Sequence, residues 1–214
     1  MHKVVIIGSG GHAKVIVDIL RNSKNYSPVG FTDPNPQGKT IMGLPVLGDD
    51  SFLPELLKKG LRHAFVAIGD NRRRVELSDS VRSIGFELIN AISPYAYISP
   101  TATLGVGIAI MPGAIIHPDT VIQDYVIINT GATVDHDCFI EIGCHIAVGC
   151  TIAGNVKVGL GSLLSVGCKV IPKVNIGEWT IVGAGAVVVN DLPGYSMAIG
   201  VPAKIVKKLQ EEKV

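Results

Sequence analysis

The sequence is poor in aromatic and charged residues. Aromatic side chains make up 5% of the 214 residues and charged side chains 17%, below the roughly 25% charged residues of an average protein. The net charge is +1, so the chain lacks the basic surplus with which proteins bind nucleic acids or anionic membranes. Its 47% hydrophobic residues are enough for a substantial core, which excludes an intrinsically disordered chain.

Long hydrophobic runs and paired cysteines are also missing. No apolar run approaches the roughly 18 residues of a membrane-spanning helix, and the apolar residues 4–7 are too few for the core of a signal peptide. The cysteines form no CxxC pair, so neither a zinc knuckle nor a redox motif is indicated. We therefore expect a cytoplasmic protein with reduced cysteines, which neither spans a membrane nor binds nucleic acid. The cysteines are Cys138, Cys144, Cys150 and Cys168.

The first half of the sequence alternates between strand-like and helix-like patterns. These segments lie at residues 4–7, 13–20, 29–31, 52–59, 63–68 and 72–84. Short apolar runs alternating with helical periodicity predict a small parallel α/β unit over residues 1–93. The arginines at positions 72–74 begin the last helix, and we expect them to lie on its solvated surface.

From Ile98 onwards the sequence follows a different period. Every sixth residue from Ile98 to Val188 is aliphatic, over sixteen positions without a slip, and the residue four places further on is mostly small. A fixed short period indicates a solenoid, in which each hexad gives a short strand and a turn. Three hexads would close a triangular coil, so residues 18 apart would stack at about 4.8 Å. All the cysteines fall at the small, inward positions.

The first predicted strand ends in a glycine-rich loop. Gly8, Gly10 and Ala13 fit the pattern G-x-G-x-x-[G/A], and Asp33 follows at the end of the second strand. After a strand and before a helix, this pattern holds the phosphates of a dinucleotide. A nicotinamide-dependent oxidoreductase is therefore one interpretation, although the unit is about half a full dinucleotide domain. A tight turn without a ligand is the alternative.

His136 stands out because it lies between Asp135 and Asp137 on an otherwise apolar solenoid. A carboxylate partner fixes the tautomer of a histidine and raises its basicity, which a general base needs. The alternative is an exposed polar residue in a turn. The solenoid histidines, which include His117 and His145, offer no short-spaced pair. This disfavours a zinc hydratase, and we expect no metal.

One segment of the solenoid resembles a known active site. The stretch from Asn129 to Cys138, followed by His145 and by residues 153–155 (AGN), is similar to that of bacterial sugar acetyltransferases. These enzymes join a small nucleotide-binding domain to a left-handed parallel β-helix. They include N-acetyltransferases of UDP-4-amino sugars and O-acetyltransferases of sialic acid. The resemblance reaches the closing residues 200–204 (GVPAK).

The resemblance implies two domains and two sets of site residues. Residues 1–93 would form an α/β nucleotide-sugar-binding domain, and residues 94–214 a left-handed β-helix that binds acetyl-CoA and carries the catalytic residues. His136 would be the general base and Asp137 would support its basicity, while His145 would contact the acetyl thioester. The implied substrate-binding residues are Gly10, Gly11, His12, Asp33, Gly69 and Asn71.

Further expectations concern the donor and the assembly. The long pantetheine of CoA would lie along the solenoid axis beside residues 18 apart, such as Val166 and Ala184. Gly154 would let the backbone approach it closely, and Lys204 would meet the CoA phosphates. The hexads have no insertion that could fold over a substrate, so a second copy must supply the concavity of a pocket. We therefore expect a homotrimer with its active sites between subunits.

The sequence thus predicts an acetyl-CoA-dependent N-acetyltransferase of a nucleotide-linked, UDP-type amino sugar in cell-surface polysaccharide biosynthesis. O-acetylation of sialic acid or a related sugar is the nearest alternative, because the sequence does not distinguish an amine from a hydroxyl acceptor. A nicotinamide-dependent oxidoreductase and a non-catalytic interaction scaffold are alternatives from other classes. The oxidoreductase explains neither the sixteen hexads nor His136.

Overall fold

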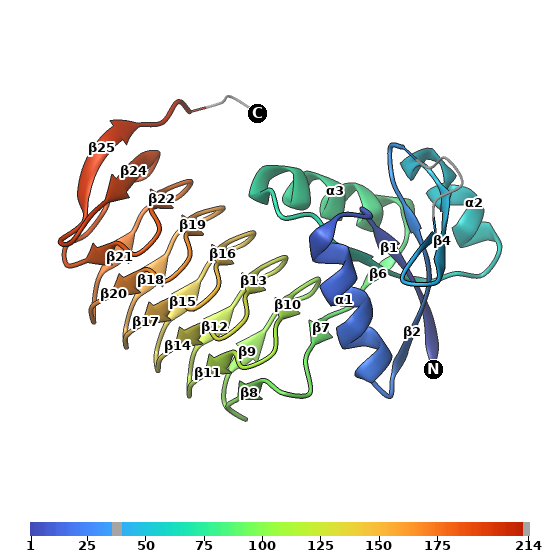
Figure 1. Ribbon diagram of the computed structural model, residues 1–214, viewed down its shortest axis with the longest axis horizontal. Coiled ribbons are helices and arrows are strands. Elements are labelled where there is room, and N and C mark those ends of the chain that lie inside the picture. The colour runs from blue at the N-terminus through green and yellow to red at the C-terminus, as the bar shows by residue number, and fades with distance from the viewer. Residues whose placement is uncertain (36–39, 212–214) are drawn as a thin grey trace. The chain divides into compact units, whose positions relative to one another are not determined.

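The computed structural model describes residues 1–35 and 40–211. The chain divides into two compact units, Met1–Pro94 and Tyr95–Val214. The first is an α/β domain and the second a parallel β-helix of short stacked strands (Figure 1), so the predicted fold class is confirmed. Residues 212–214 of the predicted second domain lie outside the described residues. Within the described ranges, no helix is long and apolar enough to cross a membrane.

The first unit is built on a six-stranded sheet with the order β3-β4-β2-β1-β5-β6. Its strands pair in parallel except β3, which runs antiparallel to β4. The elements are β1 (His2–Ile7), α1 (Gly11–Asn22), β2 (Tyr26–Thr32), β3 (Thr40–Ile41), β4 (Leu44–Gly48), the 3-10 helix η1 (Asp50–Phe52), α2 (Leu53–Lys58), β5 (His63–Val66), α3 (Asn71–Ile84), β6 (Glu87–Leu88) and β7 (Ala91–Ile92).

The predicted strands and helices of this unit are all present, and the unit has further short strands at its edges that were not predicted. β3 and β4 form a hairpin whose two-residue turn is Met42-Gly43, with φ of 50° and 76°. Such a turn needs positive φ at both positions, which glycine adopts at little cost. The strand patterns on either side are too short to stand out without this turn signal.

The two helices beside the sheet begin at its carboxyl edge, where β1 and β5 end. Helix α1 follows the glycine loop, with Gly10 as its N-cap and an apolar face that includes Ile16 and Leu20. Helix α3 is capped by Asp70, whose Oδ1 accepts a hydrogen bond from the Arg73 backbone N–H at 2.9 Å. The order strand, loop, helix therefore brings the loops after β1 and β5 to the same edge.

Sixteen two-residue strands, β8 to β23, make up most of the three walls of the β-helix, and β24 and β25 extend one of them. Each of the sixteen ends on the aliphatic residue of a predicted hexad. The strands of this unit are β8 (Tyr97–Ile98), β9 (Thr103–Leu104), β10 (Ala109–Ile110), β11 (Ile115–Ile116), β12 (Val121–Ile122), β13 (Ile127–Ile128), β14 (Thr133–Val134), β15 (Phe139–Ile140), β16 (His145–Ile146), β17 (Thr151–Ile152), β18 (Lys157–Val158), β19 (Leu163–Leu164), β20 (Lys169–Val170), β21 (Asn175–Ile176), β22 (Ile181–Val182), β23 (Val187–Val188), β24 (Ser196–Ile199) and β25 (Lys204–Lys208).

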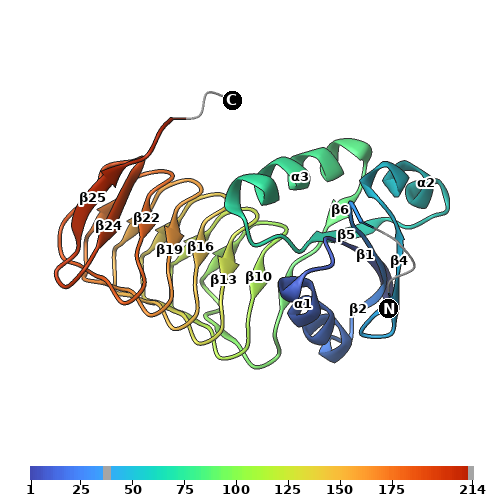
Figure 2. The ribbon, with the colours of Figure 1, turned by 45° about the horizontal axis from the view of Figure 1, so that its top comes forward.

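Strands 18 residues apart pair in register, as the period predicts. Ile116 pairs with Val134, and Val134 with Ile152, along the wall β8-β11-β14-β17-β20-β23. The coils stack in this way along the prism (Figure 2). The aliphatic hexad positions from Ile110 on are buried, as are the four cysteines. Burial of each large aliphatic side chain contributes about 1.5–3 kcal/mol, which compensates for strands of only two residues.

The corners of the prism require left-handed backbone at fixed positions. At the corner between the walls of β14 and β15, this conformation recurs every 18 residues. Aspartate and asparagine adopt it more readily than most other non-glycine residues. The residues with positive φ at this corner are Asp119, Asp137, Asn155 and Lys173, with φ between 56° and 64°. The fold therefore dictates a turn at Asp137 and determines where its neighbour His136 stands.

Candidate active site

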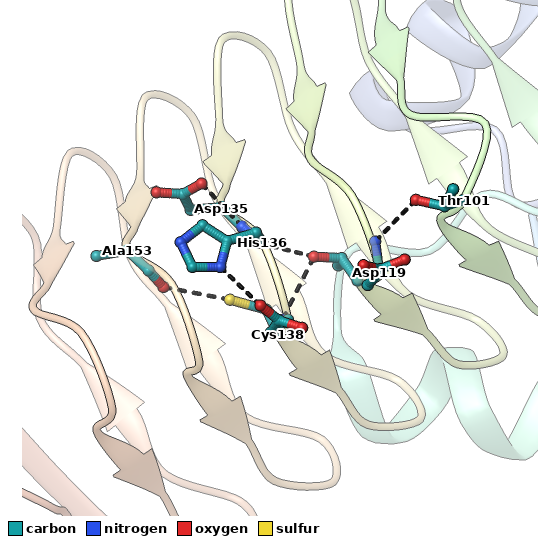
Figure 3. A network of polar contacts seen from close by, with 8 residues as sticks. Thr101, Asp119, Asp135, His136, Cys138 and Ala153 are labelled. Atoms are coloured by element: carbon teal, nitrogen blue, oxygen red, sulfur yellow. Dashed lines mark hydrogen bonds and ion pairs between the residues drawn. The ribbon is translucent and has the colours of Figure 1, made fainter.

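His136 projects from the corner between β14 and β15. Asp137, with φ of 56°, makes the turn there, and its backbone N–H donates to the carbonyl of Pro118 in the preceding coil at 3.1 Å. The His136 side chain is 53% exposed. Figure 3 shows the imidazole beside Asp135 on the outside of the solenoid wall. A reacting group can therefore approach it from solvent.

The carboxylates of Asp135 and Asp137 bind different groups of His136. Asp137 Oδ2 lies 2.7 Å from His136 Nδ1, whereas Asp135 Oδ1 accepts a hydrogen bond from the backbone N–H of His136 at 2.8 Å. The hydrogen bond to Asp137 is the main cause that raises the pKa of His136, and the negative charges of Asp135 and Asp137 add to it. Because Nδ1 donates to Asp137, the neutral imidazole carries its lone pair on Nε2. That nitrogen is the basic one.

The absence of a side chain at Gly154 makes room for the His136 imidazole. A Cβ added at Gly154, 18 residues after His136, would lie 2.6 Å from both Cε1 and Nε2 of the ring. Real Cβ atoms do not approach other atoms so closely, so any larger residue at position 154 would displace the ring. Gly154, which was predicted to lie in the donor site, thus also makes room for the ring of the base.

His145 lies in β16, on a different wall, and its Nε2 is 3.0 Å from Asn129 Nδ2. Asn129 Oδ1 accepts a hydrogen bond from the Thr130 backbone N–H at 2.8 Å, which fixes the amide so that its nitrogen faces His145. An amide nitrogen only donates. His145 Nε2 is therefore the acceptor, and its hydrogen is on Nδ1. The sequence motif included Asn129 without assigning it this contact.

The predicted donor-binding residues lie at two corners of the prism. Val166 and Ala184 stand on consecutive coils at the corner that Asn129 also occupies, and both are exposed. The Gly185 backbone N–H donates to the Val166 carbonyl at 2.9 Å, which links the two coils there. Gly154 lies at the His136 corner instead. Lys204 is exposed at the start of β25.

The glycine loop of the first unit borders a cavity of about 580 Å³. Its wall is completed by the loop after β5 and by the end of β2. Asp33 Oδ2 accepts hydrogen bonds from both the backbone N–H and the Oγ of Ser9, at 3.1 and 2.5 Å, so this carboxylate also holds the loop in shape. Of the predicted substrate-binding residues, the cavity is lined by Gly10, Gly11, His12, Asp33 and Gly69.

His12 is held neutral in the first turn of α1. Burial lowers its pKa to about 4, and the positive charge of Arg74 contributes. Within the part of the chain that the structure describes, its buried Nε2 has no hydrogen-bond partner. The expectation that all three arginines at 72–74 are solvated is wrong for Arg74, which is 1% exposed. Its position on the inner face of α3 explains the burial.

Comparison with known proteins gives this geometry a context. The sequence profile described as the PglD N-terminal domain matches residues 3–81. A solved structure of perosamine N-acetyltransferase from Caulobacter crescentus, a histidine-to-asparagine variant with CoA and GDP-perosamine, is 50% identical. It covers 97% of this chain and 98% of its own, with a TM-score of 0.94. A histidine-to-alanine variant of that enzyme has the same two ligands.

Other relatives agree with this match. The acetyltransferase domain of PglB from Neisseria gonorrhoeae, in complex with acetyl coenzyme A, is 35% identical with a TM-score of 0.91. It covers 96% of this chain and 99% of its own. Among curated proteins, the uncharacterized protein L142 of Acanthamoeba polyphaga mimivirus is 34% identical over 104 residues. The match spans 49% of this chain and 20% of that protein.

An α/β domain followed by a β-helix, with a carboxylate-supported histidine on its surface, defines a hexapeptide-type acyltransferase. The chain belongs to the family of PglD-type nucleotide-sugar N-acetyltransferases, close to PerB, the perosamine enzyme of Caulobacter crescentus, and to the PglB acetyltransferase domain. The acetyltransferase class predicted from the sequence is confirmed at the level of this family. The relatives favour transfer to an amine over the O-acetylation alternative and over the oxidoreductase.

Proposed function

We propose that the protein transfers an acetyl group from acetyl-CoA to the amino group of a GDP-linked 4-amino sugar. The observation that carries the chemistry is the His136–Asp137 pair, with Nδ1 bound at 2.7 Å and the imidazole exposed. The relative at 50% identity was solved with CoA and GDP-perosamine, which favours a guanine nucleotide over the uridine type expected from the sequence.

The reaction needs one base and one hydrogen-bond donor. The sugar amine attacks the thioester carbonyl, a nitrogen–carbon bond forms, and the carbon–sulfur bond breaks to release CoA. His136 Nε2 takes the proton that the amine loses, directly or through water, and Asp137 stabilises the resulting imidazolium. The Nδ1–H of His145 provides a donor for the oxyanion that develops on the carbonyl oxygen. Direct transfer requires no cysteine or serine nucleophile.

The nucleotide part of the acceptor would bind in the cavity of the first unit. Gly10 and Gly11 at the start of α1 let a diphosphate approach backbone N–H groups at a helix N-terminus. His12, Asp33 and Gly69 complete the lining of the proposed site, and Asn71, which does not line the cavity, is a further proposed contact at the start of α3. Acetyl-CoA would use the β-helix, with its pantetheine along the Val166 and Ala184 corner and its phosphates near Lys204.

We further propose that three copies form the active sites between them. His136 and Gly154 lie at one corner of the prism, whereas the second corner carries Asn129, Val166 and Ala184, with the His145 ring against Asn129. Packing the first corner of one copy beside the second corner of the next would bring base and donor site together. Cyclic symmetry closes such a set. We place the reaction in the cytoplasm, where the four thiols stay reduced.

Mixed assemblies test the location of the active site. His136→Ala and His145→Ala chains, each with a different affinity tag, are co-expressed and the mixed trimers are isolated. If each site takes one histidine from either neighbour, about one site in three is intact and activity returns to a comparable fraction. Mixed trimers of two differently tagged His136→Ala chains are the control and should stay inactive. Absence of recovery would place both histidines in one subunit's site.

Thiol release from acetyl-CoA tests the activity itself. The enzyme is assayed with GDP-linked and UDP-linked 4-amino sugars, with the free sugar, and with a sialic acid as hydroxyl acceptor. We expect the fastest turnover with the GDP-linked amine, and an amide product by NMR. His136→Ala should lower turnover by about 10²–10⁴-fold with a smaller change in donor binding. Faster reaction with the hydroxyl acceptor would overturn the proposal.

A further inference from the structure

Arg74 is buried beneath the loop that follows β5. Its side chain is 1% exposed, and its position in α3 is one turn after the start of the helix at Asn71. Transfer of an ion from water to a protein interior costs several kcal/mol unless hydrogen bonds compensate. The buried guanidinium of Arg74 therefore needs hydrogen bonds that compensate for its lost hydration, and its contacts supply them.

The guanidinium holds three acceptors of one loop at the same time. Nη1 donates to the carbonyls of Ile68 and Gly69, both at 3.1 Å, and Nη2 donates to Asn71 Oδ1 at 2.8 Å. The planar fork of arginine suits such a set, because its donors point in fixed directions. Arg74 thereby ties the loop after β5 to the first residue of α3.

The loop that Arg74 holds lines the nucleotide-sugar cavity. Ile68 and Gly69 form part of its wall, and the Ile68 side chain lies directly beside Gly8 of the glycine loop. With its oxygen bound to Arg74, the Asn71 amide has a fixed orientation, and its nitrogen can only donate. The charge of Arg74 also acts on the residue that follows the glycine loop, since it helps to lower the pKa of His12. One buried side chain thus acts on both loops.

We propose that Arg74 is a positioning residue for the nucleotide sugar, which fixes the loop 68–71 in its binding conformation without touching the substrate. This inference rests on the proposed function, because it assumes that the acceptor binds in this cavity. Fixing a loop before binding lowers the entropy lost on binding. Loss of Arg74 should therefore weaken acceptor binding and leave the acetyl-transfer step on the β-helix unchanged.

The test compares steady-state constants of full-length Arg74→Gln and Arg74→Lys. For Arg74→Gln we expect the KM for the GDP-linked amino sugar to rise about 10- to 100-fold, the range for a lost charged hydrogen-bond set. The kcat and the KM for acetyl-CoA should stay unchanged. Arg74→Lys keeps the charge but lacks the fork, so its KM should lie closer to that of Arg74→Gln than to that of the native enzyme.

Controls separate this role from a general loss of stability. Arg82→Gln, which removes an exposed arginine from the last turn of the same helix, should behave like the native enzyme. A merely destabilising change reduces the active fraction, so it lowers the apparent kcat at unchanged KM. That result, or a native KM in Arg74→Lys, would overturn the inference. Calorimetry of the native enzyme with GDP tests the assumption separately, since no binding there would refute the proposed function itself.

Discussion

The imidazole of His136 lies over the α-carbon of Gly154, so closely that a Cβ at position 154 would be 2.6 Å from Cε1 and Nε2. The two residues are 18 apart and therefore occupy the same corner in consecutive coils. The base is thus supported on one side by the carboxylate of Asp137 and on the other by the backbone of the next coil. Its orientation depends on a residue without a side chain.

Gly154→Ala should therefore displace the base without unfolding the β-helix. The ring is the end of a flexible side chain and yields before the backbone does, so we expect kcat to fall about 10- to 100-fold. Both KM values should change little. The control is Gly113→Ala, which makes only ordinary contacts to Gly131 and meets no catalytic side chain, although its φ of 73° adds backbone strain that position 154 lacks. A full kcat in Gly154→Ala would show that the ring position seen here is not the catalytic one.

Asp137→Asn should move the pH profile of kcat/KM. The base works only when neutral, so activity is lost as the pH falls through the pKa of His136. The hydrogen bond to Asp137 raises that pKa; its loss should shift the acid limb to lower pH and reduce the plateau rate. Asparagine tolerates the φ of 56° at this corner.

The control for this profile is Asp119→Asn, one coil earlier at the same corner with φ of 58°. The acid limb of its pH profile should not shift, because within the described residues Asp119 makes no hydrogen bond to a histidine ring. An unshifted limb in Asp137→Asn would mean that another group sets the profile.

Gly10→Val should affect binding more than folding. Within the described residues, a Cβ at Gly10 meets no atom within 4 Å, and its φ of −78° suits any residue. The melting temperature should therefore fall only slightly, because valine is a poorer N-cap than glycine, while the branched side chain keeps a diphosphate from the backbone. We expect affinity for the GDP-linked sugar to fall by about 1–3 kcal/mol. If calorimetry shows acetyl-CoA binding lost and the acceptor kept, the two sites are reversed.

The neutral state of His12 makes stability depend on pH. The pKa is about 4 in the folded protein and 6.5 in the unfolded chain, so the unfolded state binds more protons between these values. The free energy of unfolding should fall as the pH drops below 6.5, by about 2 kcal/mol from this group between pH 7 and pH 5. Denaturant unfolding of the native protein and of His12→Asn at both pH values measures the difference. Equal pH slopes for the two proteins would contradict the burial of this imidazole.

Repetition explains why the β-helix could be predicted closely. A single strand of two residues gives only a weak sequence signal, but the same inward position is aliphatic in all sixteen hexads. Nearly all of these aliphatic residues are buried in the structure. The hairpin of β3 and β4 has no such repetition. Its short strands depend on a single two-residue turn and on pairing with β2.

The burial of Arg74 was not predicted, because this residue belongs to a run of three arginines. Three consecutive arginines suggest a solvated surface, yet only one of them points inward. The helical period contained the signal, because Arg74, Leu77, Ser78 and Val81 follow the spacing i, i+3, i+4, i+7 and are the buried residues of α3. The contact between His136 and Gly154 could not be predicted from the sequence. The period predicts that the two residues stack, but it does not predict the His136 rotamer that places the ring over the next coil.

The antiparallel strand β25 covers the end of one wall of the β-helix. A stack of equivalent coils could in principle be continued by the coils of another molecule, which would produce a fibre. β25 lies at the end of one wall after β24 and runs opposite to it, so an incoming coil would not meet a parallel edge along this wall. Three of its five residues are lysines, Lys204, Lys207 and Lys208, and lysines on an edge strand discourage further pairing. Concentrated solutions of this enzyme should therefore hold discrete particles that do not polymerise end to end.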